Sequence, residues 1–123
     1  MLTGFENETH DITDYELQQV LPAIRSGLLK KEGAAMAVTN KQIVAGLEKN
    51  RGVKTNEARV RKIINYIRNN NMIPRLIASS KGYYIASSRQ EVIDYIESLK
   101  GRENAIKQVR VAMEEQLQSF HFA

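Results

Sequence analysis

The spacing of apolar residues changes at the asparagine triplet 69–71, and this change constrains the fold of the 123-residue chain more than any other feature. Before the triplet, apolar residues recur every three or four positions, which is the period of an amphipathic helix. After it, the runs 73–78 and 82–86 follow the two-residue period of a strand, and the sequence Ser-Ser-Lys-Gly between them is typical of a hairpin turn. Pro74 restricts the first run to a sheet edge or marks its start. The sequence therefore predicts helices followed by a β-hairpin.

The first expected helix runs from Thr13 to about Lys31. Its apolar residues fall on one helical stripe: Leu17, Val20, Leu21, Ile24 and Leu28. Pro22 lies within the pattern, so either the helix kinks there or its regular part starts near Leu21 with the proline in the first turn. Both alternatives stay open.

Two shorter helices should follow. Thr39 is the expected N-cap of a helix that ends at the Asn-Arg-Gly of residues 50–52. Thr55 or Asn56 is the expected cap of a third helix, which runs to about Asn70.

A long C-terminal helix should start after the hairpin, since Ser88 and Glu91 have the spacing of a capping box. Its apolar residues form a seam with heptad spacing: Val92, Ile96, Leu99, Ile106, Val109, Met113 and Leu117. Such a seam predicts packing against another helix, and we expect a homodimer through these residues. Arg102 and Glu103 interrupt the seam, so folding back on the same chain is the alternative.

Length and composition indicate one globular domain with extensions. We expect an acidic flexible tail at 1–12, a folded domain at 13–87 and the C-terminal helix at 88–123. The chain has no cysteine, which excludes disulfides and thiolate metal sites. It shows neither a signal peptide nor an apolar run long enough to span a membrane, so a cytoplasmic protein without membrane partners is expected.

Positive charge is concentrated in the middle of the chain. The formal net charge of the chain is +4. Residues 41–81 hold ten Lys or Arg and two acids, whereas residues 1–16 hold five acids and no Lys or Arg. This polarity predicts one surface that attracts polyanions.

The stretch 39–86 contains a short helix, a turn, the basic helix VRKIINYIR and a hairpin that ends in GYYI. It resembles a winged helix-turn-helix domain and is similar to those of small phage and prophage-encoded DNA-binding proteins, over roughly residues 12–110. The resemblance implies a mainly α fold with a small β-hairpin, a winged helix-turn-helix extended by the long C-terminal helix. It also implies double-stranded DNA binding, in transcriptional regulation or in phage replication or maintenance.

The third helix, at about 55–70, is the expected recognition helix, because a polar, cationic face lies opposite its isoleucines. The hairpin, at about 75–84, is expected to act as a basic wing, and the start of the second helix to touch the DNA backbone. Arg59 and Arg61 lie near the boundary of the apolar arc, where either could instead brace the fold through a carboxylate. The expected DNA contacts are Lys41, Gln42, Lys54, Thr55, Asn56, Ala58, Arg59, Arg61, Lys62, Asn65, Tyr66, Asn69, Arg75, Ser80 and Lys81.

The sequence does not predict an enzyme. The two histidines, His10 and His121, lie near the chain ends, and no metal-ligand spacing or phosphate-binding glycine motif is present, so we expect no cofactor or metal. Two other functions compete with DNA binding. One is a winged-helix module for protein interaction, and the other is RNA binding, which is disfavoured because no aromatic platform for unstacked bases is visible.

Overall fold

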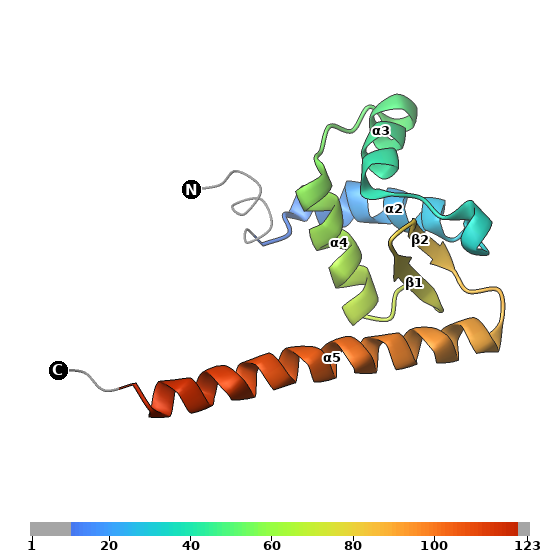
Figure 1. Cartoon of the computed structure of the whole chain (residues 1–123). Coiled ribbons are helices and arrows are strands. Elements are labelled where there is room, and N and C mark those ends of the chain that lie inside the picture. The colour runs from blue at the N-terminus through green and yellow to red at the C-terminus, as the bar shows by residue number, and fades with distance from the viewer. Residues whose placement is uncertain (1–10, 121–123) are drawn as a thin grey trace. The chain divides into compact units, whose positions relative to one another are not determined.

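The computed structural model describes residues 11–120, and the chain divides into two compact units, residues 1–87 and 88–123. The first unit contains all the helices and strands except the last helix (Figure 1). Its elements are the π-helical turn η1 (Glu16–Val20), α2 (Leu21–Leu28), the 3₁₀ turn η2 (Ala34–Met36), α3 (Asn40–Arg51), α4 (Glu57–Asn69), β1 (Leu76–Ser79) and β2 (Gly82–Ile85). The second unit consists of α5 (Arg89–Gln118). The prediction of a mainly helical chain with a small hairpin and a long C-terminal helix is therefore confirmed.

Pro22 is the second residue of α2, and the π turn η1 ends two residues before it. Proline has no N–H to donate, so a regular helix through this point would lose one backbone hydrogen bond. The π turn changes the bonding pattern just before it, and the N–H of Leu21 donates to the carbonyl of Glu16, five residues back. Of the two alternatives for the first helix, the structure has the regular part starting at Leu21.

Side-chain caps define the starts of α3 and α4. Thr39 and Gln42 form a reciprocal capping box, in which each side chain accepts a hydrogen bond from the other residue's backbone N–H. Asn56 caps α4 by accepting from the N–H of Arg59 at 2.9 Å, so Asn56 rather than Thr55 is the cap. Gly52 ends α3 with a φ of 64°, a conformation that glycine adopts without a steric cost.

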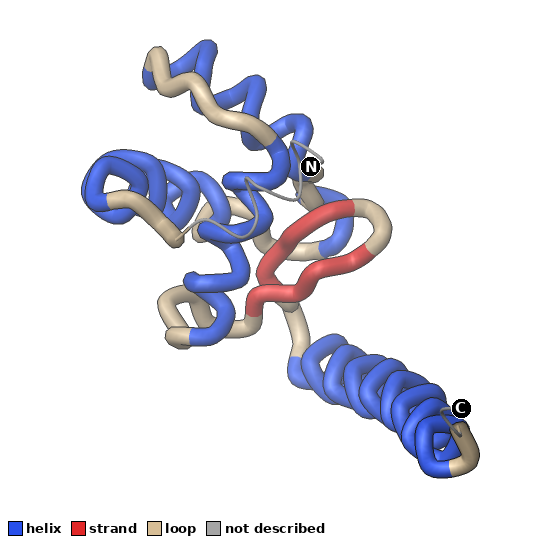
Figure 2. Tube along the Cα trace, turned by 90° about the vertical axis from the view of Figure 1, so that its left-hand side faces the viewer, coloured by secondary structure: helices blue, strands red, loops and turns tan. Residues whose placement is uncertain are grey.

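The hairpin pairs Leu76 with Ile85 and Ser79 with Gly82, and its two strands appear as the red pair in Figure 2. The first strand starts three residues later than the apolar run at 73–78 predicts. Arg75 has a φ of 60°, which no strand residue adopts, so Ile73 and Pro74 belong to the turn that precedes the strand.

The other edge of β2 is paired with the segment that joins α2 to α3. Val38 and Tyr83 exchange two backbone hydrogen bonds of 2.7 and 3.0 Å, and Ile85 donates to the carbonyl of Lys31 at 2.7 Å. A Cβ atom built on Gly82 would lie 2.3 Å from the carbonyl oxygen of Val38, so only glycine fits this approach. The side-chain pattern of residues 31–38 did not predict this pairing.

The hydrophobic core lies between the three helices and the hairpin. The members contributed by α4 are completely buried, with 0% exposure: Val60, Ile63, Ile64 and Ile67. The π turn η1 contributes Val20, and α2 contributes Leu21, Ile24 and Leu28. Ile12 packs against this core, so the expected tail at 1–12 ends earlier than predicted. The rest of that tail, residues 1–10, lies outside the described residues.

Candidate nucleic-acid interface

Helix α4 has one apolar face and one polar face. Because four of its apolar residues fill the core, helical geometry turns the opposite side outward. Arg61, Asn65 and Asn69 are exposed on that side, and Lys62 is partly exposed. The outward row of cation and amide side chains thus has the orientation that a groove-reading helix requires.

This polar face borders an open hollow of about 470 Å³. One lining residue, Ile12, comes from the segment before the first helix. The other five come from α4: Arg61, Lys62, Asn65, Tyr66 and Asn69. The lining thus carries two cations, two amides and a phenol, but no carboxylate. These groups suit an anionic, hydrogen-bonding ligand.

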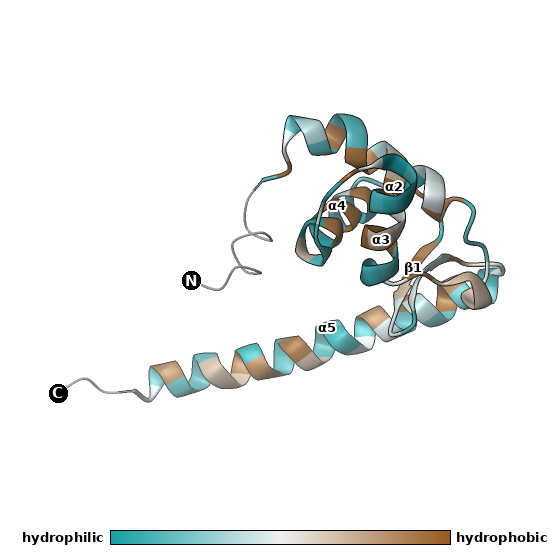
Figure 3. Ribbon diagram, turned by 90° about the horizontal axis from the view of Figure 1, so that it is seen from above, coloured by the Kyte–Doolittle hydropathy of each residue, from teal (hydrophilic) through white to brown (hydrophobic). Residues whose placement is uncertain are grey.

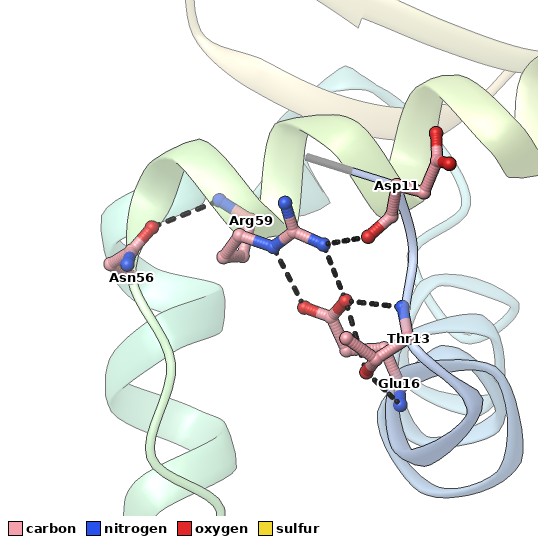
Figure 4. Close-up of polar contacts among 5 residues, drawn as sticks. All are labelled: Asp11, Thr13, Glu16, Asn56 and Arg59. Atoms are coloured by element: carbon pink, nitrogen blue, oxygen red, sulfur yellow. Dashed lines mark hydrogen bonds and ion pairs between the residues drawn. The ribbon is translucent and has the colours of Figure 1, made fainter. Parts of the chain in front are cut away.

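Arg59 does not belong to this exposed face. Its side chain is 11% exposed and binds Glu16 with two hydrogen bonds, from Nε to Oε2 at 2.9 Å and from Nη2 to Oε1 at 2.5 Å (Figure 4). Nη2 also donates to the backbone carbonyl of Asp11 at 3.0 Å. The carboxylate brace is therefore the role that the structure gives Arg59, and the assignment of Arg59 as a DNA contact is wrong for this arrangement.

The Arg59–Glu16 pair changes the acidity of both groups. The hydrogen bond from the Arg59 guanidinium, opposed by partial burial, lowers the pKa of Glu16 below its ordinary value. The same hydrogen bond raises the pKa of Arg59. Both shifts favour the charged pair, which joins the N-terminal segment to the first turn of α4.

The prediction for Ala58 is also wrong for this arrangement. Ala58 was expected to face the DNA as a small residue that permits close approach, but it is only 6% exposed and packs inward. The first turn of α4 thus turns two of its predicted contacts toward the protein. The outward row begins at Arg61.

Five more predicted contacts lie around the starts of α3 and α4. Lys41 and Lys54 are exposed, and Thr55 is partly exposed. Asn56 and Gln42 use side-chain oxygens as helix caps, to the backbone N–H groups of Arg59 and Thr39 respectively. The side-chain oxygens of Gln42 and Asn56 are therefore engaged in helix capping.

The hairpin tip presents Ser80 and Lys81 to solvent. Ser79 organises the turn, because its Oγ accepts from the N–H of Lys81 at 3.2 Å and donates to the carbonyl of Gly82 at 2.9 Å. Arg75 lies at the hairpin base, half exposed, with Nη1 at 3.9 Å from a carboxylate oxygen of Glu32. An exposed pair at that distance leaves the guanidinium available to a stronger anion.

Two residues near α4 were not predicted from the sequence: Ile12, which lines the hollow, and Glu16, which binds Arg59. A local signal for Glu16 exists: Thr13 and Glu16 have capping-box spacing, and each backbone N–H donates to the other's side chain, at 3.0 and 3.1 Å. That signal places the glutamate at a helix start. It does not reveal that Arg59, 43 positions later, binds the same carboxylate.

Comparison with models of known protein families, with curated proteins and with solved structures gave no match. Within residues 11–120, no group of three or more His, Asp or Glu side chains is arranged to hold a metal ion. Over the same residues, no helix has the length and apolar character needed to cross a bilayer.

Proposed function

We propose that residues 11–87 form a winged helix-turn-helix domain that binds double-stranded DNA, with α4 as its recognition helix and the β1–β2 hairpin as its wing. The order of α3, turn, α4 and hairpin supports this fold. A transcriptional regulator and a phage replication or maintenance factor both fit the activity.

The observation that carries the proposal is the outward face of α4. An α-helix enters the major groove, where amides pair with adenine edges and Lys or Arg with guanine edges and phosphates. Asn65 and Asn69 supply the amides, and Lys62 lies beside them among residues that include no acid. An ordinary solvated helix face would intersperse acids at helical spacing, but the only acid of α4 is Glu57, in its first turn.

Electrophoretic retardation of a random-sequence duplex pool at several salt concentrations tests the proposal. With four to six phosphate contacts, the logarithm of affinity should fall against the logarithm of salt with a slope of about −4 to −5. Lys62→Glu should weaken binding about tenfold or more and make the slope about one unit shallower. Lys30→Glu is the matched control, because it makes the same charge change at an exposed residue outside α4 and the wing.

Retardation that is absent or insensitive to salt would contradict DNA binding. Equal losses in Lys62→Glu and Lys30→Glu would contradict the assignment of α4, since net charge alone would then explain the effect. If retardation is absent or insensitive to salt, a protein-interaction module is the function that remains; if the two losses are equal, DNA binding remains but α4 is not shown to carry it. Where retardation is salt-dependent and Lys62→Glu weakens it more than Lys30→Glu does, selection of bound duplexes from the same pool identifies the preferred sequence.

A further inference from the structure

The 30-residue helix α5 carries apolar side chains that its own unit does not cover. No residue of the helix is buried, and the side chains of Ile106, Val109 and Met113 are 70%, 65% and 57% exposed. Figure 3 shows apolar and polar segments alternating along the helix. Apolar side chains aligned on a helix at this exposure are typical of an interface.

The spacing of these residues is palindromic. Six of the seven seam residues follow this pattern: Val92, Ile96, Leu99, Ile106, Val109 and Met113. The seventh, Leu117, lies beyond it. The intervals between the six are four, three, seven, three and four residues, the same in either direction along the chain. The midpoint of the pattern falls between Arg102 and Glu103, the two charged residues that interrupt the seam.

We propose that α5 pairs with α5 of a second copy in antiparallel orientation, about a two-fold axis that passes between Arg102 and Glu103. Reversing one helix about this axis places each of the six residues level with another of the six. The resulting layers are Val92 with the partner's Met113, Ile96 with the partner's Val109, and Leu99 with the partner's Ile106. The seventh seam residue, Leu117, falls level with the partner's Ser88, at the end of the pairing.

The central charges favour the antiparallel orientation over the parallel one. In a parallel pair in register, Arg102 would lie level with the partner's Arg102 and Glu103 with the partner's Glu103. Like charges at the same level of an interface are repulsive and cost free energy on desolvation. In the antiparallel pair, Arg102 lies level with the partner's Glu103, and the symmetry repeats this complementary arrangement.

The palindrome also favours a second copy over any other occupant of the seam. A two-fold interface must be self-complementary, so the pattern on one helix must match its own reversal. Folding back on residues 1–87 or binding an unrelated protein imposes no such symmetry. The pairing does not depend on DNA binding, so the two proposals succeed or fail separately.

Disulfide trapping tests the orientation, because the natural chain has no cysteine. Two single-cysteine chains, Val92→Cys and a size-tagged Met113→Cys, are mixed, unfolded, refolded together and oxidised mildly. Antiparallel pairing predicts that the mixed 92–113 disulfide forms in at least about tenfold excess over either like disulfide. In that pairing, identical positions lie about 32 Å apart at 1.5 Å per residue, far beyond disulfide reach. A predominance of like disulfides, or a statistical mixture, would overturn the proposal.

Sedimentation equilibrium of the full chain without DNA gives an independent check. Ile106→Lys places a charge in the seam and should weaken dimerisation at least about tenfold. Gln108→Lys is the matched control, because it introduces the same side chain on the opposite face of the helix and should leave dimerisation unchanged. A monomeric wild-type chain at micromolar concentration, or equal effects of the two substitutions, would refute the pairing. Circular dichroism establishes that both variants keep the helix.

Discussion

Replacing Glu16 with glutamine should destabilise the first unit by about 2–3 kcal/mol. Arg59 and Glu16 are 11% and 13% exposed and share two charged hydrogen bonds, each of a kind worth about 1.5–3 kcal/mol. Removing one partner of a fully buried pair costs about 3–5 kcal/mol, and residual solvent access reduces that figure here. Glutamine keeps the shape and one acceptor oxygen but leaves the guanidinium without its counter-charge. The loss is a large part of the 5–15 kcal/mol that usually separates folded from unfolded states.

The effect should depend on pH in a defined direction. The pKa of Glu16 is lowered in the folded state from its ordinary value of 4.5, so the folded protein holds the ionised form more strongly than the unfolded chain does. The stabilisation from the pair is therefore fully present above the ordinary pKa. It is lost as the pH falls from 4.5 through the lower folded-state pKa. The difference between wild type and Glu16→Gln should shrink over that acidic interval.

Urea unfolding followed by far-ultraviolet circular dichroism measures the free energy of unfolding at pH 7 and at several acidic values. Glu48→Gln, a substitution at an exposed carboxylate on α3, is the control and should change stability by less than about 0.5 kcal/mol. A double-mutant cycle with Arg59→Met should give a coupling energy of about 1–3 kcal/mol. If Glu16→Gln matches Glu48→Gln at pH 7, or if its deficit grows on acidification, the reasoning about this pair is wrong.

Two further predictions concern a tight turn and a helix cap. Gly82→Ala should destabilise the first unit by more than about 2 kcal/mol, because the new Cβ would meet the carbonyl of Val38 at 2.3 Å and the φ of 122° disfavours a side chain. Gly46→Ala, in open space on α3, is the control and should be neutral or stabilising; equal effects of the two substitutions in urea unfolding would contradict the close approach. Thr39→Ala should cost about 1 kcal/mol in the same assay, since it removes one half of the capping box with Gln42. Restoration by Thr39→Ser is expected, and an unchanged unfolding midpoint in Thr39→Ala would show that the cap contributes nothing.

Features set by neighbouring residues could be predicted from the sequence. The caps at Thr39 and Ser88 were identifiable, and the cap of α4 was narrowed to Thr55 or Asn56, because a cap needs a small polar side chain next to an apolar helical pattern. The core face of α4 was identifiable because four apolar residues recur at helical spacing. The outward direction of Asn65 and Lys62 follows from the same periodicity.

Features that depend on distant contacts could not be predicted in this way. Periodicity places Arg59 beside the apolar arc, but whether it faces solvent or a carboxylate depends on Glu16, which another helix positions. Pairing of the 31–38 segment with β2 depends on backbone hydrogen bonds that leave little trace in side-chain pattern. Arg75 looked like part of a strand because neighbouring residues are apolar, and its φ of 60° is fixed by the turn from α4 into the hairpin.

If α5 pairs as proposed and the first unit binds DNA as proposed, the length of α5 bears on the spacing of the two DNA half-sites. In an antiparallel pair centred between Arg102 and Glu103, the two Arg89 residues that begin the helices are separated by about 40 Å along the pair, at 1.5 Å per residue. One turn of B-DNA advances about 34–36 Å, so both domains would be attached at a spacing close to one turn. On those two proposals, the attachment points of such a pair suit an inverted repeat with half-site centres about 10 base pairs apart.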